Sequence, residues 1–315
     1  MNSNLSKNTF PPDADILPPS DDRIFKVLLT HPNAKQILID VISTVIERNV
    51  TDVHIRGNEV PVMDIDEKNQ RFDVNCTINT GEQVNVEMHC YRQDELGSTH
   101  ENFINKYVYF LTDLHSSQES NGILYRNLVK TYQITFCMYT VLPSLPNFVN
   151  RFSLRTSNGV QLTDQVNMII IELSKIKEIL KKPVEEMTSF EMWSLFLGYA
   201  QEPMHRKLIN DIITSKEEIG MAATLLREIS KDEHERARAR SRKMYEMDQI
   251  SNLLTSEERG FNNGMEKGIK KGRTEGKTEG EAIGRAKSEA YILSLFEQGL
   301  SVDEIKQRLS HVRDV

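Results

Sequence analysis

The chain has 315 residues, of which 38% are hydrophobic, so it is long and apolar enough for two domains or for one core domain with appendages. Its net charge of -7 argues against a protein that coats nucleic acid with a strongly basic surface, but not against an enzyme that meets DNA through a local basic patch and a metal ion. Neither a secretion signal nor a membrane-spanning apolar segment is recognisable, and we therefore expect a cytoplasmic protein with no membrane partner.

The N-terminal part of the chain predicts a tail followed by two helices. Residues 1–20 are rich in proline, serine and asparagine, which is typical of a flexible tail. A helix is expected from about Asp22, because Ser20 and Asp21 can cap it and an apolar stripe follows. A second apolar-striped helix is expected from Asn33. The residues alone favour an ordinary role for Asp22, that of an acid at a helix N-terminus, where it interacts well with the helix dipole.

A β-hairpin is the strongest local signal in the sequence. After a connection over residues 50–62 that includes a short strand, residues 71–90 alternate apolar and polar side chains on both sides of a glycine-containing turn. A three-residue loop with Gly81 in the left-handed conformation gathers all apolar residues on one face and sets Asn75 opposite Asn85.

The same register places Asp73 opposite Glu87 on the polar face. Like charges directly opposite each other destabilise a sheet unless a cation, a shared proton or full solvation compensates. One interpretation is a site for a divalent, oxygen-binding ion such as Mg2+. The other is the exposed face of an antiparallel sheet, with both acids in water, and the spacing does not decide between the two.

The next segments complete an α/β pattern. Residues 101–114 predict a helix in which Lys106 lies beside an apolar stripe and could reach a phosphate, although a solvated surface lysine is the commoner case. Residues 132–142 predict a central strand, and residues 148–154 and 168–173 predict further strands. Alternating helices and strands of this kind indicate an α/β sandwich with a mixed sheet. The cysteines lack metal-site spacing and are expected to be reduced core residues. They are Cys76, Cys90 and Cys137.

From Ser174 onward the pattern is helical. Trp193 is expected to anchor the core rather than to stack on bases. Residues 231–243 predict a locally basic helix whose arginines either contact phosphates or belong to a solvated face balanced by its own acids. These arginines are Arg236, Arg238, Arg240 and Arg242.

A glycine repeat follows near the C-terminus. Glycine recurs at every fourth position from Gly260 to Gly284, mostly separated by Lys, Glu, Arg and Thr. Each glycine destabilises a helix by about 1 kcal/mol relative to alanine, so an isolated helix is not expected here. The repeat is either a flexible spacer or a helix whose glycine stripe lets a second backbone approach closely. Residues 290–309 predict a small helical hairpin around Gly299.

Several segments, taken in order, resemble a known family of nucleases. They are Asp22-Arg23-Ile24-Phe25-Lys26, Arg71-Phe72-Asp73, Val86-Glu87-Met88-His89 and Lys106-Tyr107-Val108-Tyr109-Phe110, followed by the glycine repeat. They resemble the Asp … (Asp/Glu)-x-Lys pattern of the restriction-endonuclease-like nucleases, and are most similar to the recombination-promoting nucleases, also described as PD-(D/E)xK family transposases. The chain departs from that family at two positions. His89 replaces the usual Gln of the family and Lys of the wider superfamily, and Lys106 replaces the usual Arg.

The resemblance implies both a fold and an activity. The fold would be α/β, a restriction-endonuclease-like mixed sheet flanked by helices and followed by a helical C-terminal region. The activity would be that of a metal-dependent DNA endonuclease associated with recombination, mobile elements or defence. Asp73 and Glu87 would bind Mg2+ or Mn2+, and His89 would be the third catalytic residue. Asp22 and Lys106 would support the site.

We expect five segments along the chain. They are a flexible tail at 1–20, the nuclease core at 21–175, a helical region at 176–255, the glycine repeat at 256–286 and a helical hairpin at 287–315. The C-terminal region is expected to form a homo-oligomer. The alternative is a catalytically impaired assembly or DNA-binding module that self-associates through the same region, and the unusual His89 keeps this alternative open.

Overall fold

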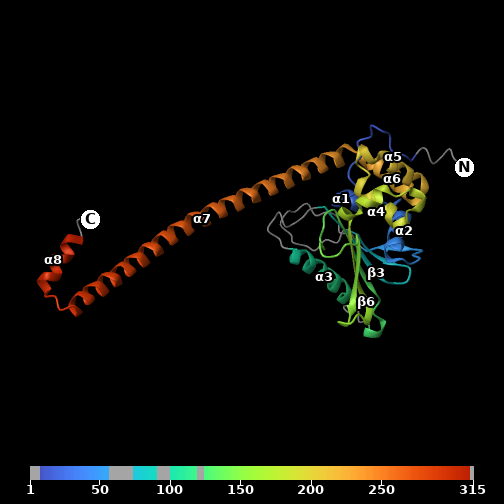
Figure 1. Cartoon of the computed structure of the whole chain (residues 1–315). Coiled ribbons are helices and arrows are strands. Elements are labelled where there is room, and N and C mark those ends of the chain that lie inside the picture. Colours follow the sequence, from blue (N-terminus) through green and yellow to red (C-terminus); the bar gives the residue numbers. More distant parts are fainter. Residues whose placement is uncertain (1–7, 57–73, 91–99, 119–123, 313–315) are drawn as a thin grey trace. The chain divides into compact units, whose positions relative to one another are not determined.

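The computed structural model describes residues 8–56, 74–90, 100–118 and 124–312. The chain divides into two compact units, Met1–Gln249 and Ile250–Val315. Figure 1 shows the helices and strands of both units. Among the described residues, no helix is both long enough and apolar enough to cross a membrane.

The strands of the described residues form one mixed sheet in the order β1-β2-β3-β4-β6-β5. They are β1 (Val53–Ile55), β2 (Val74–Ile78), β3 (Gln83–His89), β4 (Thr131–Cys137), β5 (Val149–Arg155) and β6 (Gln161–Glu172). The β3–β4 and β4–β6 pairs are parallel, whereas the β1–β2, β2–β3 and β5–β6 pairs are antiparallel. The predicted α/β fold is therefore confirmed, and β4 lies inside the sheet as predicted for residues 132–142.

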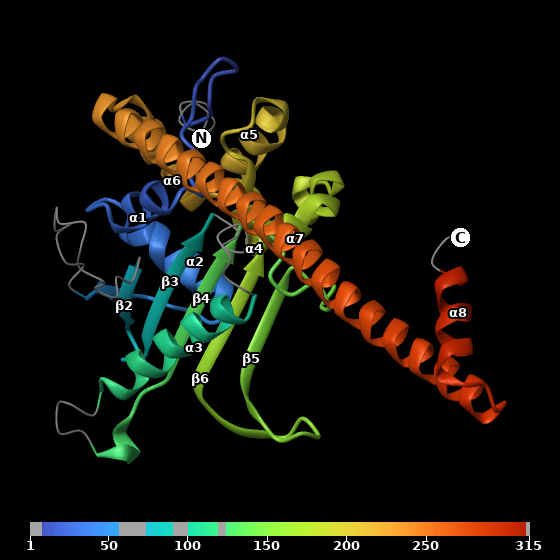
Figure 2. The same cartoon turned by 90° about the vertical axis from the view of Figure 1, so that its left-hand side faces the viewer.

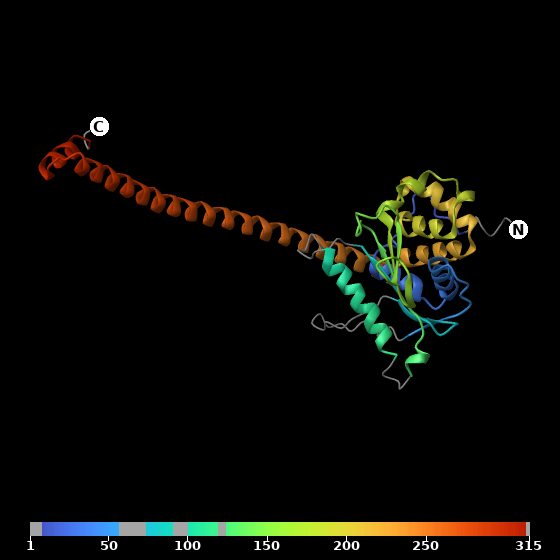
Figure 3. The same ribbon diagram turned by 60° about the horizontal axis from the view of Figure 1, so that its bottom comes forward.

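Helices cover both faces of this sheet and bury two clusters of apolar side chains (Figure 2, Figure 3). The helices over the larger cluster are α1 (Asp22–Thr30), α2 (Lys35–Ile46), α4 (Ser189–Tyr199), α5 (Arg206–Ser215) and α6 (Glu217–Lys231). The smaller cluster lies under α3 (His100–Ser116). Short 3-10 helices are η4 (Tyr125–Asn127), η5 (Leu173–Lys181), η6 (Val184–Glu186) and η7 (Pro203–His205). Trp193 is 1% exposed in the larger cluster, which confirms its predicted role as a core anchor.

The β2–β3 hairpin has the predicted register. Gly81 closes the three-residue loop with a φ of 85°, a left-handed conformation that glycine adopts readily. Asn75 lies opposite Asn85, as predicted. Asp73 lies outside the described residues, so its pairing with Glu87 stays a prediction.

The polar face of β3 is buried rather than solvated. The exposed fractions of Gln83, Asn85, Glu87 and His89 are 3%, 0%, 4% and 9%. Helix α3 packs on this side of the sheet, and its aromatic side chains contact His89. The alternative of an exposed polar face with its acids in water therefore does not hold for β3.

The described part of the N-terminal segment differs from the predicted flexible tail. Phe10 and Ile16 are buried in the larger cluster, with exposed fractions of 1% and 5%. The main-chain amide of Phe10 donates to Asn210 Oδ1 at 2.9 Å. Composition indicated flexibility, but a residue far along the sequence holds this backbone in place, and no local pattern reveals such a partner.

The glycine repeat is helical, which agrees with the second of its two interpretations and not with a flexible spacer. Helix α7 (Glu233–Glu297) begins in the first unit and contains the whole repeat. The Lys, Glu and Arg residues between the glycines have high helix propensity, which offsets part of the glycine cost. Helix α8 (Val302–Val312) follows a turn at Gly299, whose φ is 82°. Leu295 and Ile305 are buried, which agrees with the predicted helical hairpin.

Candidate active site

Glu87 is a buried carboxylate in the middle of the sheet. It lies on β3, opposite Thr135 of the parallel neighbour β4, on the side covered by α3. Its Oε1 accepts a hydrogen bond from Asn85 Nδ2 at 3.0 Å. An ionised carboxylate in such a place depends on hydrogen bonds and on nearby positive charge. A cation bound here would therefore act on Glu87 more strongly than at an exposed acid.

A row of amide and hydroxyl side chains, which we call the polar ladder, crosses from β3 to β4. It consists of Asn85, Gln133 and Thr135, all of them 0% exposed. Asn85 Nδ2 donates to Gln133 Oε1 at 2.8 Å, and Gln133 Nε2 donates to Thr135 Oγ1 at 3.1 Å. Linked buried groups of this kind restrict one another's rotamers. The polar ladder therefore orients Asn85 and, through it, the carboxylate of Glu87.

His89 lies on the same face as Glu87, two residues further along β3 and about 7 Å away. Its ring makes edge-to-face contacts with Phe103, Tyr107 and Tyr139, at centroid distances of 5.2, 6.1 and 5.7 Å. The Tyr139 hydroxyl lies 3.2 Å from His89 Nδ1, so one ring nitrogen is engaged whichever tautomer is present. The aromatic contacts hold the imidazole in one orientation beside the carboxylate.

Asp22, in the first turn of α1, meets the end of β3. The Cys90 thiol donates to Asp22 Oδ1 at 2.8 Å. Burial raises the pKa of Asp22 above the ordinary aspartate value, and neighbouring Asp21 adds to this, whereas the thiol hydrogen bond and the charges of Arg242 and Lys106 lower it. Burial dominates this balance. Asp22 and Lys106, the two predicted supporting residues, therefore lie within electrostatic range of each other at the end of β3.

Lys106 is not a fully solvated lysine. It is half-buried, and its Nζ lies 5.1 Å from the ring centroid of Tyr107 and 5.3 Å from that of Phe110. Cation–π contacts of this kind favour a charged ammonium over an aromatic surface. The charge of Lys106 is thus held on the same helix whose rings cover His89.

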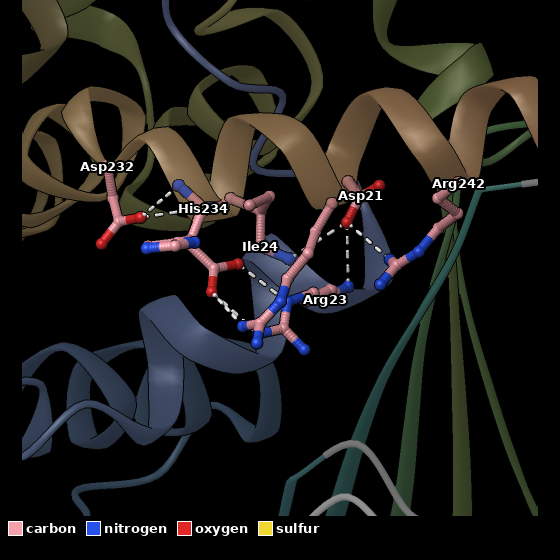
Figure 4. A network of polar contacts seen from close by, with 8 residues as sticks. Asp21, Arg23, Ile24, Asp232, His234 and Arg242 are labelled. Atoms are coloured by element: carbon pink, nitrogen blue, oxygen red, sulfur yellow. Dashed lines mark hydrogen bonds and ion pairs between the residues drawn. The ribbon is translucent and has the colours of Figure 1, made fainter. Parts of the chain in front are cut away.

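The first turns of α7 are anchored to α1 by a set of ion pairs, which we call the α1–α7 clamp (Figure 4). Arg23 donates from Nε and Nη2 to the two oxygens of Glu235, at 2.8 Å each. Arg242 Nη1 donates to Asp21 Oδ1 at 2.8 Å. The same oxygen caps α1 by accepting from the amides of Arg23 and Ile24, at 3.0 and 3.1 Å. The clamp therefore fixes the end of α1 that carries Asp22.

Arginines of the basic segment at residues 231–243 are also engaged in ion pairs. Arg236, Arg238 and Arg242 form ion pairs with Asp15, Glu235 and Asp21. Two of these acids lie near the N-terminus rather than on the same helix. The balanced face that the sequence offered as one interpretation is thus present, but its acids come partly from elsewhere in the fold.

A second buried carboxylate, Glu172 at the end of β6, has a different character. It accepts from the amides of Val141 and Leu142 at 2.7 and 2.8 Å, and from Lys175 Nζ at 2.5 Å. A carboxylate with this many donors is satisfied by the protein itself. We therefore assign Glu172 a structural role in fixing the loop after β4.

The oxygen atoms around Glu87 fit a hard divalent cation. Carboxylate and amide oxygens are the ligands that Mg2+ and Mn2+ prefer. Buried here, besides the carboxylate, are the side-chain oxygens of Asn75 and Asn85, for which the described residues provide no hydrogen-bond partner. Asp73 directly precedes β2 in the sequence but lies outside the described residues. The described residues contain no group of three or more His, Cys, Asp or Glu that could hold a metal by themselves.

Comparison with known proteins identifies the family. A sequence model described as PD-(D/E)XK nuclease family transposase matches residues 19–256. The chain belongs to this family. The region that matches the PD-(D/E)XK nuclease family transposases includes the sheet, the polar ladder and the α1–α7 clamp. Comparison with curated proteins and with solved structures finds no match.

Some features of this site were not predicted from the sequence. The polar ladder had a partial signal, because Gln133 and Thr135 alternate with apolar residues within a predicted central strand. The contact of Tyr139 with His89, and that of Cys90 with Asp22, had none, because each joins segments that only the folded chain brings together.

Proposed function

We propose that the chain is a Mg2+- or Mn2+-dependent endonuclease that hydrolyses phosphodiester bonds of DNA. The family match gives the reaction class, and the observation that carries the finer proposal is the buried Glu87 carboxylate, hydrogen-bonded by Asn85 at 3.0 Å beside an oriented imidazole. Glu87 and Asp73 would hold the ion. A bound ion of this kind polarises the scissile phosphate and lowers the pKa of the attacking water.

The remaining residues have distinct roles in this proposal. His89 stabilises charge near the attacking water as an imidazolium, or hydrogen-bonds that water as a neutral ring, with Tyr139 holding it in place. Lys106 offers a point charge to a phosphate of the substrate. Asp22 supports the site from the end of α1. The substrate is DNA, in recombination, at mobile elements or in defence, and the free thiols of all three cysteines suit the cytoplasm.

Nicking of supercoiled plasmid tests this proposal. The purified chain should cut only when Mg2+ or Mn2+ is present, and Asp73→Ala and Glu87→Gln should each abolish cutting while circular dichroism stays unchanged. Cutting that persists in EDTA, or in both variants, would contradict the proposed site.

We also propose that the second unit mediates self-association. From Gly260 to Gly284, a Cβ added at any of the seven glycines would meet nothing within 4 Å in the described residues beyond its chain neighbours and the backbone of its own helix. Phe261, Met265 and Ile269 are 70%, 52% and 65% exposed beside this stripe. A helix with an open small-residue stripe next to exposed apolar side chains fits a second helix, and a second copy of the chain offers an identical one. This function does not depend on catalysis. It would therefore also hold for the alternative, a catalytically impaired chain that serves only as an assembly module.

A further inference from the structure

Two asparagines beside Glu87 form a close cross-strand pair. Asn75 on β2 lies directly opposite Asn85 on β3. The main-chain carbonyl of Asn75 accepts from the Arg56 amide at 2.8 Å, on the β1 side. The backbone groups of Asn75 therefore point away from β3, and the pair is of the non-hydrogen-bonded type. In such pairs the Cα atoms are about 4.5 Å apart and the side chains approach most closely.

Both side-chain oxygens of this pair are buried, and within the described residues neither has a hydrogen-bond partner. The amide of Asn85 is not free to turn, because its nitrogen donates to Glu87 Oε1 at 3.0 Å and to Gln133 Oε1 at 2.8 Å. Native proteins seldom leave buried acceptors unsatisfied, and here two residues that carry such acceptors are paired directly across the strands. The pair therefore marks a place for a group that donates hydrogens or carries positive charge.

The position of the pair indicates what that group is. The Asn85 amide that presents one of the oxygens also touches the Glu87 carboxylate through its nitrogen. Mg2+ dehydrates reluctantly and keeps several waters when one or two carboxylates bind it. Those waters are hydrogen donors that need acceptors, and the groups that accept from them tune the site. Neutral amide oxygens beside a carboxylate meet this requirement without adding negative charge.

We propose that Asn75 and Asn85 accept hydrogen bonds from the water molecules of the divalent ion at Glu87, and so help to hold the hydrated ion on the polar face of the β2–β3 pair. This inference rests on the proposed metal site but adds residues that neither the family match nor the sequence pattern assigns. Asn85 contacts both the carboxylate and the hydrated ion in this arrangement, because its amide nitrogen donates to Glu87 and its amide oxygen accepts from a water of the ion. Asn75 contributes the acceptor alone and is therefore the residue to change.

Calorimetric titration of the full chain with two probes tests the inference. The first probe is Mg2+. The second is hexaamminecobalt(III), whose ammonia ligands do not exchange, so that it binds only through hydrogens donated by its outer surface. Asn75→Leu removes the acceptor at similar volume and should weaken binding of both probes about fivefold to tenfold, the effect of one lost hydrogen bond. Asn75→Asp should tighten binding of the cobalt complex, and serves as well if the leucine variant is poorly folded. Thr77→Val, on the same face of β2, is the matched control and should leave both affinities unchanged.

The outcomes separate this inference from the proposed metal site. If Asn75→Leu binds both probes like the wild type, the inference is wrong and the metal site stands. A lower melting temperature of Asn75→Leu with unchanged affinities would show a structural water instead, and would also overturn the inference. If the wild type binds no Mg2+, the metal site itself is refuted.

Discussion

Replacing Glu87 by glutamine separates the metal-binding role of this residue from its structural one. Alanine at this position would leave one N–H of Asn85 without its acceptor in a buried place, which costs about 1–3 kcal/mol of folding free energy. Glutamine keeps a side-chain oxygen for Asn85, removes the charge and replaces the second carboxylate oxygen by an NH2 group. Without metal, we therefore expect Glu87→Gln to be at least as stable as the wild type, because it no longer buries a carboxylate.

The size of the metal effect follows from linkage. At a free Mg2+ concentration of about one hundred times Kd, binding to the native state adds about 2.7 kcal/mol to the free energy of unfolding. A change of about 1 kcal/mol shifts the Tm of a unit of about 150–250 residues by about 2–4 °C. The first unit should therefore melt about 5–10 °C higher with Mg2+ in the wild type, and Glu87→Gln should lose this shift.

Differential scanning calorimetry with a series of Mg2+ concentrations measures this shift directly. Glu178→Gln is a suitable control, because Glu178 is an exposed carboxylate on η5 whose ion pair, within the described residues, is with exposed Lys181. The control should keep the full wild-type shift. Equal shifts in the wild type and in Glu87→Gln would refute the assignment of Glu87 as a metal ligand.

Four further outcomes are expected. Burial raises the pKa of Asp22, so the folded state favours the protonated carboxyl group, and the free energy of unfolding decreases as pH rises through the raised pKa. Asp22→Asn should therefore raise Tm at neutral pH and weaken the dependence of Tm on pH in the acid range. The bidentate hydrogen bonds from Arg23 lower the pKa of Glu235, so their contribution of about 1 kcal/mol is present at neutral pH and lost as pH falls through the lowered value; Glu235→Gln should lose it at neutral pH in urea unfolding. Deletion from Gly260 onward should leave a folded first unit with fewer copies per particle in light scattering. An unchanged number of copies per particle would favour a simple spacer. His89→Ala should impair plasmid nicking; retained activity in His89→Lys at high pH would indicate a charged imidazolium, and retained activity in His89→Gln a neutral ring.

The hairpin shows how far sequence reasoning reaches. Period-2 alternation and Gly81 together predict the register, because a shift by one residue would move every apolar side chain to the wrong face. The same pattern could not tell whether the polar face meets water or another layer. That depends on where α3 packs, and α3 follows β3 only after residues outside the described part of the chain.

The site shows the complementary limit. Glu87 and His89 can be chosen from the sequence because they lie two positions apart on one face of a strand and match a family pattern. The groups that orient them, Tyr139 and Gln133, come from β4 and the loop after it, and only the parallel pairing of β3 with β4 brings them close. Long-range pairings of this kind leave little trace in a single sequence.

The helical glycine repeat gives the second unit an adjustable geometry. Four residues lengthen an α-helix by about 6 Å and carry it about 40° past a full turn. Gain or loss of a single repeat would therefore move α8 along the axis of α7 by that length and rotate it by that angle. About nine repeats would restore the original direction. Within the second unit, the number of repeats thus sets the distance and the rotation between α8 and the start of the repeat, while the sequence of the C-terminal hairpin itself stays the same.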